Sequence, residues 1–429
     1  MIKIIKKIIF ILIGLSAIYG VGRLIDVSYG SFQFVERQPY MVMQTQNSIR
    51  VKWQTDEAEI GEVNYSTTEG KLSQNIQEKE ATNKHSVTLT NLKECTKYYY
   101  SVDSKSLDID NKGRSFSTLC QENEKQLLWI VGDSGDETEG KYKVYNQFLD
   151  YIKNDFDRVN MWILLGDNAY TSGTQEQFNT TLFEPFIEMV KRFTPWAVPG
   201  NHDMRRWAFY QIFDFPTEAE SGGFASGHEE FYSIENGNLH LVMLDSETIS
   251  RDSDGKMATW LKKDLAQNTK PWLIVAFHTP PYSDGGHKSD NDRDSGGRLK
   301  DMRENFVPIF DEYGVDLVLS GHSHGYERSK LILNHLGKSD TFSEKNILQD
   351  RKTDYIKPLK HLKNSGTIYQ ICGSSAKLDG ADYAHPALPY SLHEMGSLLI
   401  ELTPTTLTSK FLNINGKITD EFKITREKI

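Results

Sequence analysis

Polar residues follow short apolar runs at five places in the sequence, and this pattern limits the fold more than any other feature. A run of four to eight apolar residues bounded by turn residues predicts a buried β-strand. In α/β sheets, ligands collect beyond the carboxyl ends of the strands. We therefore predict that the five segments converge on one shared site. In chain order they are 132–135 (GDSG), 166–170 (GDNAY), 200–203 (GNHD), 275–278 (VAFH) and 321–328 (GHSHGYER).

From residue 127 onward, strand-like and helical patterns alternate. Such alternation predicts an α/β architecture with buried strands. Strands are expected at 127–131, 161–165, 196–198, 239–244, 272–277 and 315–319, and helices at 141–153, 175–192, 257–267 and 299–313. Strand-like runs return at 397–402, 408–413 and 421–424, whereas the polar segment 337–359 is expected to be an irregular surface loop.

The segment 31–120 predicts an all-β domain. Its runs 48–54, 62–66, 85–89 and 98–102 alternate apolar and polar residues, or are rich in β-branched and aromatic residues. The stretch from Leu92 to Tyr98 resembles the tyrosine-corner region of a fibronectin type III-like sandwich. No cluster of Cys, His or acidic residues in this segment suggests chemistry, so we expect a structural or recognition role.

Three cysteines occur in the sequence. Cys95 precedes one predicted strand and Cys120 ends the next, so an antiparallel hairpin would bring them together. Two unpaired thiols are an equal alternative, because a pair requires suitable Cα spacing. Cys372 lies in an apolar run and is expected to be an inert core residue.

Residues 1–28 predict a signal peptide or an N-terminal membrane anchor. Lys3, Lys6 and Lys7 precede the apolar run 8–22, which is the order found in secretory signals. The run is short for a membrane-spanning helix, which usually needs about 20 apolar residues. Export is therefore favoured, and membrane attachment through residues 4–22 is the alternative.

The composition is that of a globular protein. The chain has 429 residues, of which 38% are hydrophobic and 25% charged, enough for two domains with their own cores. The formal net charge is −10. Non-specific nucleic-acid binding needs a basic footprint, so no nucleic acid is expected as a stable partner.

The polar residues of the five segments are of the types that bind metal ions. Carboxylate and phenolate oxygens suit a hard trivalent ion, whereas imidazole and amide groups suit a divalent one. A lone Asp after a strand is more often a cap or turn residue, and a lone His-x-His is weak evidence for a metal. Five such segments in fixed order are explained more simply by one site. The candidate ligands are Asp133, Asp167, Tyr170, Asn201, His278, His322 and His324.

These motifs resemble those of the calcineurin-like metallophosphoesterase superfamily and, within it, the purple acid phosphatase family. The family pattern is Asp-x-Gly, Gly-Asp-x-x-Tyr, Gly-Asn-His-Glu/Asp, Val-x-x-His and Gly-His-x-His, and all five parts are present here. Tyr170 is the most discriminating residue, because most other metallophosphoesterases lack it. The resemblance extends from residue 127 to the C-terminus. The β-sandwich in front resembles the N-terminal domain of the larger family members.

The resemblance implies a fold, a domain order and a cofactor. The expected fold is an α/β (α+β) metallophosphoesterase domain, a β-sheet sandwich flanked by helices, preceded by an all-β sandwich domain. The expected boundaries are 1–28 for the signal peptide or anchor, 29–121 for the fibronectin type III-like domain and 125–429 for the catalytic domain. The cofactor is Fe(III) plus a divalent ion (Fe, Zn or Mn). By resemblance, Asp133, Asp167, Tyr170 and His324 would hold Fe(III), and Asp167, Asn201, His278 and His322 the divalent ion, with Asp167 bridging.

Two further histidines receive catalytic roles from the same resemblance. His202 is expected to contact the substrate phosphate and to assist departure of the leaving group. His287, in the loop after His278, is a candidate general acid; a solvated loop histidine is the alternative. His240 and Asp245 also lie in or after a predicted strand. We expect His240 to be a core residue or a hydrogen-bond partner of a ligand, and Asp245 to be a cap or such a partner.

The resemblance implies a dinuclear-metal acid phosphatase. It would hydrolyse phosphate monoesters by in-line attack of a metal-bound hydroxide, with highest activity at acidic pH. The alternatives are a phosphodiesterase on the same scaffold, with nucleotide or lipid head-group substrates, and a cell-surface binding protein with a vestigial metal domain. The protein is expected to be exported, either periplasmic, extracellular or membrane-anchored with the catalytic domain outside. The oligomeric state stays open.

Overall fold

The computed structural model describes residues 20, 22, 29–205 and 207–428. The predicted signal peptide or anchor at 1–28, including the possible membrane-attachment segment 4–22, therefore lies almost wholly outside the described residues. Among the helices that are described, none combines the length and the hydropathy needed to cross a bilayer.

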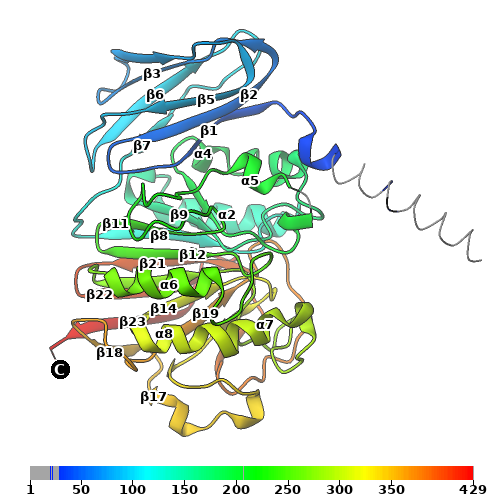
Figure 1. Cartoon of the computed structure of the whole chain (residues 1–429), viewed down its shortest axis with the longest axis vertical. Coiled ribbons are helices and arrows are strands. Elements are labelled where there is room, and N and C mark those ends of the chain that lie inside the picture. The colour runs from blue at the N-terminus through cyan, green and yellow to red at the C-terminus, as the bar shows by residue number, and fades with distance from the viewer. Residues whose placement is uncertain (1–19, 21, 23–28, 206, 429) are drawn as a thin grey trace, which may run out of the picture.

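Two small antiparallel sheets form the N-terminal part of the structure (Figure 1). The tyrosine-corner expectation is met, because the backbone N–H of Lys93 donates to Tyr98 Oη at 2.9 Å. Cys95 and Cys120 form a disulfide, which resolves the alternative that the sequence left open. One sheet contains β1 (Arg37–Val42), β2 (Ile49–Glu59) and β5 (Thr82–Leu89), and the other β4 (Gln74–Gln77), β3 (Glu62–Ser66), β6 (Lys97–Asp103) and β7 (Ser115–Ser117).

Two seven-stranded sheets form the rest of the protein. In spatial order, the first contains β10 (Pro195–Ala197), β9 (Met161–Leu164), β8 (Gln126–Val131), β21 (Gly396–Leu402), β22 (Thr406–Asn413), β23 (Ile418–Glu427) and β18 (Asp354–Pro358). The second contains β11 (Phe231–Asn236), β12 (Leu239–Leu244), β13 (Trp272–Ala276), β14 (Leu317–Ser320), β19 (Ile368–Cys372), β15 (Tyr326–Arg328) and β20 (Tyr390–Leu392). Strands β8, β9 and β10 run parallel, as do β12, β13, β14 and β19.

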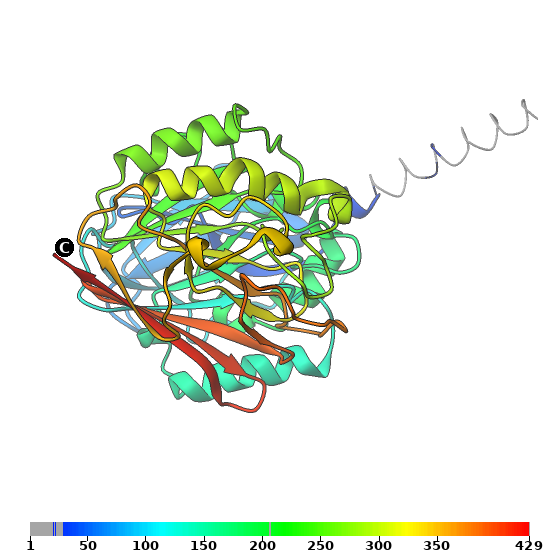
Figure 2. The same ribbon diagram turned by 90° about the horizontal axis from the view of Figure 1, so that it is seen from below.

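The two sheets pack face to face, and helices cover their outer faces. Alternate residues of a strand face opposite sides: Leu241 and Met243 of β12 face the core between the sheets, whereas Val242 and Leu244 face a second core. This second core lies under α6 (Lys256–Gln267) and α8 (Val307–Tyr313). Helix α2 (Glu139–Ile152) covers the outer face of the first sheet, on the opposite side of the sandwich (Figure 2). The sheet sandwich flanked by helices agrees with the predicted fold class.

Two predicted helices are interrupted. The segment 175–192 contains α3 (Gln175–Phe178), a π-helical turn and α4 (Ile187–Val190), and the segment 299–313 is interrupted by a π-helical turn at Met302–Phe306 before α8. Pro185 and Pro308 explain both interruptions, because proline has no N–H to donate and its ring clashes with the preceding turn.

The polar segment 337–359 is not wholly irregular, which corrects the sequence prediction. It ends in β18, which pairs in parallel with β23 at the edge of the first sheet. The strand is stabilised through Lys357, whose buried ammonium lies 2.9 Å from the carboxylate of Asp316. The burial of this lysine depends on a carboxylate that is distant in the sequence, and no local pattern indicates such a contact. The sequence analysis therefore did not predict this strand.

Trp129 of β8 is a key packing residue beneath the site, and its replacement tests the fold. It is fully buried and stacks on Phe148 of α2 with ring centroids 4.1 Å apart. We expect Trp129→Ala to cost about 3–5 kcal/mol, lowering the thermal unfolding midpoint by at least ~6 °C. The matched control is Trp207→Ala, because Trp207 is 55% exposed. Equal midpoints for the two variants would contradict this packing role.

Candidate metal centre

The five motifs meet where the carboxyl ends of strands from both large sheets come together. Strands β8, β9 and β10 of the first sheet lead into the loops that carry Asp133, Asp167 and Asn201. Strands β13 and β14 of the second sheet lead into the loops that carry His278 and His322. The site thus lies between two sheets, and each sheet contributes part of it.

Four side chains form a first group of donor atoms around Tyr170. Its hydroxyl donates to Asp167 Oδ2 at 2.8 Å and lies 3.2 Å from Asp133 Oδ1. His324 Nε2 lies 3.1 Å from the same hydroxyl and 3.4 Å from Asp133 Oδ1. Three oxygens and one nitrogen therefore converge within a few ångströms.

A second group of donor atoms surrounds His278. Its Nε2 lies 3.2 Å from His322 Nδ1, 3.3 Å from Asn201 Oδ1 and 3.6 Å from Asp167 Oδ1. Asp167 therefore faces the first group with Oδ2 and the second with Oδ1. This is the arrangement of a carboxylate able to bridge two ions about 3.5–4 Å apart. All seven candidate ligands are brought together in these two groups.

The backbone at the site is held in unusual conformations. Asp133, Asp167 and His322 have φ angles of +54°, +52° and +70°, which non-glycine residues adopt only at a cost. Gly166 has φ +90°, and a Cβ there would lie 2.5 Å from His278 Nδ1. A glycine is therefore required at 166 both for its conformation and for the close approach of the two loops.

The electrostatics of the first group favour a bound cation. Burial and the carboxylates of Asp133 and Asp167 raise the pKa of Tyr170 well above its usual value. Burial alone would lower the pKa of His324, but hydrogen bonds to Asp133 and Asp379 raise it to about 9. Tyr170 and His324 thus keep their protons because the surrounding carboxylates give the group an excess of negative charge. A cation bound among these donor atoms would offset that negative charge. The oxygen-rich set suits a hard ion, and the mixed nitrogen and oxygen set around His278 suits a divalent one.

Each ligand-type histidine has its other ring nitrogen held by a hydrogen-bond partner. His278 Nδ1 lies 2.8 Å from the carbonyl oxygen of Leu165, and His324 Nδ1 lies 2.8 Å from Asp379 Oδ1. His322 Nε2 lies 2.6 Å from the hydroxyl of Ser295. Such partners orient the ring and select the nitrogen that faces a metal. The sequence analysis missed Asp379, because no local pattern relates it to His324.

Asp203 joins two of the motif loops. Its buried carboxylate accepts hydrogen bonds from the backbone N–H groups of Asn168, Ala169 and Gly200 at 2.9–3.1 Å. Burial and the nearby Asp167 raise its pKa to about 7. The last residue of GNHD therefore holds the GDNAY loop in place, a role that the motif alone did not reveal.

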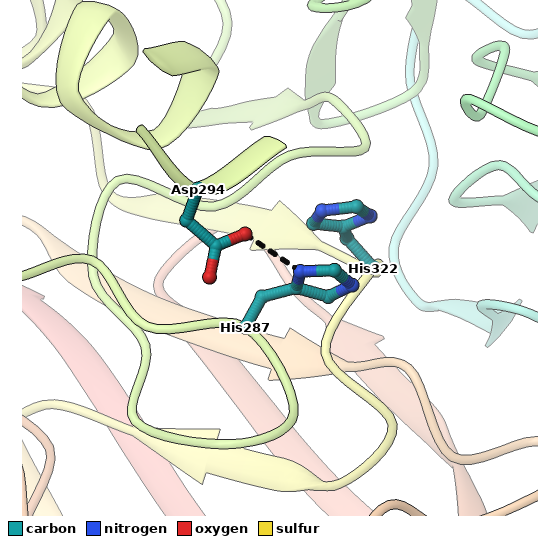
Figure 3. A group of neighbouring side chains, drawn as sticks. All are labelled: His287, Asp294 and His322. Carbon is teal, nitrogen blue, oxygen red and sulfur yellow. Dashed lines mark hydrogen bonds and ion pairs between the residues drawn. The ribbon is translucent and has the colours of Figure 1, made fainter. Parts of the chain in front are cut away.

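The two predicted catalytic histidines lie at the edge of the two donor groups. The ring centroid of His202 lies 4.3 Å from that of Tyr170, and its Nδ1 lies 2.8 Å from the carbonyl oxygen of Thr171. His287 stacks on His322 with ring centroids 3.8 Å apart, and its Nδ1 lies 2.8 Å from Asp294 Oδ1 (Figure 3). Both rings remain partly exposed and are therefore accessible from solvent.

His240 and Asp245 do not join the two groups. Asp245 accepts hydrogen bonds from the backbone N–H groups of Glu247 and Thr248, as expected of a capping residue. His240 lies 2.7 Å from Asp264 and 3.3 Å from Glu235, neither of which is a candidate ligand. It is a satisfied core residue.

The buried His240 pair predicts a pH dependence of stability. Burial alone would lower the pKa of His240, but its hydrogen bonds to Asp264 and Glu235 raise it to about 9. The stabilisation by the charged pair is therefore complete below the unfolded-state pKa near 6.5 and is lost as the pH rises through about 9. We expect roughly 3 kcal/mol of unfolding free energy to disappear across this window.

Chemical denaturation at pH 6.0 and 9.5 would measure this loss. The control is the double variant H240Q/D264N, which removes the two fully buried members of the group and leaves only the partly exposed Glu235. An equal decline in the wild type and the double variant would contradict the role of the pair.

Comparison with known proteins identifies relatives of both parts of the chain. Residues 127–326 match the calcineurin-like phosphoesterase family, and residues 37–118 match the purple acid phosphatase N-terminal domain. Purple acid phosphatase 15 of Arabidopsis thaliana is 29% identical over 58% of this chain and 50% of its own length. Purple acid phosphatase 18 of the same plant is 29% identical over 71% of this chain and 68% of its own length.

Two solved structures share the fold over 91% of this chain. A purple acid phosphatase from yellow lupin (Lupinus luteus) seeds superposes with a TM-score of 0.71 at 18% identity, over 74% of its own chain. A structure of PhoD superposes with a TM-score of 0.61 at 12% identity, over 88% of its own chain. At these identities, the likeness concerns the fold alone.

Proposed function

We propose that the chain belongs to the purple acid phosphatase family of calcineurin-like phosphoesterases, whose two domain models it matches, and that it is a dinuclear-metal acid phosphatase that hydrolyses phosphate monoesters. One observation carries the proposal. Asp167 presents one carboxylate oxygen to the donor group that contains Tyr170 and the other oxygen to the group around His278. A shared carboxylate between an oxygen-rich and a nitrogen-rich donor set is suited to two unlike ions.

In this proposal the first donor group holds Fe(III) and the second holds a divalent ion. The ligands of Fe(III) are Asp133, Asp167, Tyr170 and His324, and those of the divalent ion (Fe, Zn or Mn) are Asp167, Asn201, His278 and His322. When bound, two such ions supply an acidified water for in-line attack and offset the charge of the phosphoryl oxygens. Asp379, Leu165 and Ser295 orient the three histidines.

His202 and His287 contact the substrate in this proposal. The carbonyl of Thr171 accepts from His202 Nδ1–H, so Nε2 of His202, which lies 3.4 Å from the guanidinium of Arg205, is the nitrogen that would contact the phosphate. The carboxylate of Asp294 likewise engages Nδ1 of His287 and leaves Nε2 for the leaving-group oxygen. Protonation of the departing alcohol by a positioned imidazole is general acid catalysis.

We also propose that the protein is exported and that its domains are 1–28, 29–121 and 125–429. The disulfide between Cys95 and Cys120 supports an oxidising compartment. Cys95 lies within the segment that matches the N-terminal domain family, and Cys120 lies two residues beyond its end. Periplasmic, extracellular and membrane-anchored locations all fit this proposal.

Hydrolysis of p-nitrophenyl phosphate and bis(p-nitrophenyl) phosphate from acidic to alkaline pH tests the activity. We expect the monoester to be the better substrate and its rate to be highest at acidic pH. Asp167→Asn should lower kcat by roughly a thousandfold or more, since the ions offset several kcal/mol of transition-state charge. The control is Asp136→Asn, a partly exposed carboxylate that pairs with Lys377.

Each other outcome has a stated meaning. Preference for the diester would favour the phosphodiesterase alternative, and an optimum above neutral pH would contradict the ferric site. No turnover of either ester by metal-loaded protein would contradict the phosphatase proposal.

Tyr170→Phe tests the ferric site by absorption. A tyrosinate ligand of Fe(III) gives a charge-transfer band in the visible region, so we expect the iron-loaded protein to be coloured and the variant to lose the band. Tyr142→Phe is the control, because Tyr142 is 45% exposed and lies on α2. A band that survives in Tyr170→Phe, with iron content unchanged, would show that another residue is the chromophoric ligand.

A further inference from the structure

A group of three ligand-type side chains lies beside the proposed divalent site. His287, Asp294 and His322 each offer a donor atom, and these atoms lie within 4.8 Å of one another (Figure 3). Taken alone, such a group resembles a third cation site. The position of Ser295 argues against that interpretation.

The hydroxyl of Ser295 occupies the space among the three donor atoms. It lies 2.6 Å from His322 Nε2, 2.9 Å from Asp294 Oδ1 and 3.3 Å from His287 Nδ1. A cation could not enter without displacing it. The group is therefore a hydrogen-bonded network with a hydroxyl at its centre.

The chemistry of the groups sets the direction of every hydrogen bond in the network. His322 faces the donor group around His278 with Nδ1, so its proton is on Nε2 and is donated to Ser295 Oγ. Ser295 then donates to Asp294, since an ionised carboxylate only accepts. Asp294 also accepts from His287 Nδ1–H at 2.8 Å. Each N–H or O–H group in the network thus has an acceptor, and no two donated protons point at each other.

We propose that Ser295 and Asp294 are positioning residues, which select the ring nitrogens that His322 presents to the metal and His287 presents to the substrate. The proposal rests on the proposed phosphatase function. Ser295 holds the proton of His322 on Nε2, and Asp294 holds a proton of His287 on Nδ1. The stacking of the two rings, with centroids 3.8 Å apart, then fixes the position of His287 relative to a metal ligand.

The backbone of the loop supports this role. Ser295 has φ +52° and ψ +31°, and Gly296 and Gly297 that follow also have positive φ angles. A non-glycine residue in this conformation costs about 1 kcal/mol or more, and the hydrogen bonds of the Ser295 hydroxyl to Asp294 and His322 offset that cost. Asp294 Oδ2 is held from the other side by the backbone N–H of Lys288 at 2.9 Å.

The loop is also anchored beyond the glycines. Arg298 donates to the carbonyl oxygen of Ser295, and its guanidinium pairs with the buried carboxylate of Glu247 at 3.1 Å. The loop is thus anchored on both sides of Ser295, through Asp294 before it and Arg298 after it. These contacts hold the Ser295 hydroxyl in place.

Asp294→Asn in the full-length, metal-loaded protein tests the effect on His287. A general acid matters most when the leaving group is poor, so kcat should fall much more for phenyl phosphate than for p-nitrophenyl phosphate. We expect the difference between the two substrates to be at least about tenfold, because general acid catalysis contributes about 10²–10⁴-fold, with KM changed little. The control is Asp292→Asn in the same loop, whose carboxylate pairs with Lys338 on the surface at 3.3 Å.

Ser295→Ala tests the effect on His322, and its readout is metal affinity. Competition with a chelator should show the divalent ion bound about 10–100-fold more weakly than in the wild type. Ser295→Gly removes the same hydroxyl and relieves the backbone strain, so it keeps the test decisive if the alanine variant does not fold. The Fe(III) content should not change in either variant.

Three results would overturn the proposal. They are an equal loss of kcat for both esters in Asp294→Asn, divalent affinity unchanged in both Ser295 variants, and effects of Asp292→Asn as large as those of Asp294→Asn. Failure of the phosphatase function is distinguishable, because a wild type inactive on both esters would still allow the metal-affinity measurement.

Discussion

The carboxylate of Asp167 is the point on which the site depends. It lies between two sheets that are built from distant parts of the sequence, and it faces a different donor group with each oxygen. The backbone N–H of His202 donates to Oδ1 at 2.8 Å, and the hydroxyl of Tyr170 donates to Oδ2. Because so many groups converge on one side chain, the strands that carry them must keep a fixed relative position. The dense packing on both faces of the first sheet, with Trp129 fully buried beneath α2, provides that rigidity.

The site combines concentrated negative charge with a surrounding layer of oriented hydrogen bonds. The carboxylates of Asp133 and Asp167 are buried, an arrangement that is costly unless positive charge is present. Around them, Asp379, Leu165 and Ser295 each engage one nitrogen of a ligand-type histidine. The three partners come from different loops, so the orientation of the rings depends on the whole edge of the sandwich. This preorganisation is what a dinuclear centre requires, since the geometry must exist before the substrate arrives.

Local patterns predicted most elements of the catalytic part, and long-range contacts explain the exceptions. The strands at 127–131 and 239–244 and the helix at 257–267 agree with β8, β12 and α6 within one residue at each end, because burial on a sheet or a helix face imposes a clear periodicity. The predictions were wrong where a single residue has a larger effect on the local structure than the hydrophobic periodicity. Pro185 interrupts a helix, and the buried ion pair of Lys357 and Asp316 turns an apparent loop into the edge strand β18.

The sequence by itself determined the identities and the order of the candidate ligands and the fold class. Metal-ligand residue types after apolar runs carry this information locally, as in the GDNAY segment that contains both Asp167 and Tyr170. Only the tertiary structure decided which atoms meet. It assigned one oxygen of Asp167 to each donor group, joined Cys95 to Cys120, and placed Asp379 beside His324 and Ser295 beside His322. The physical reason is that hydrogen-bond partners are selected by proximity in space, and proximity follows from sheet topology and core packing rather than from distance along the chain.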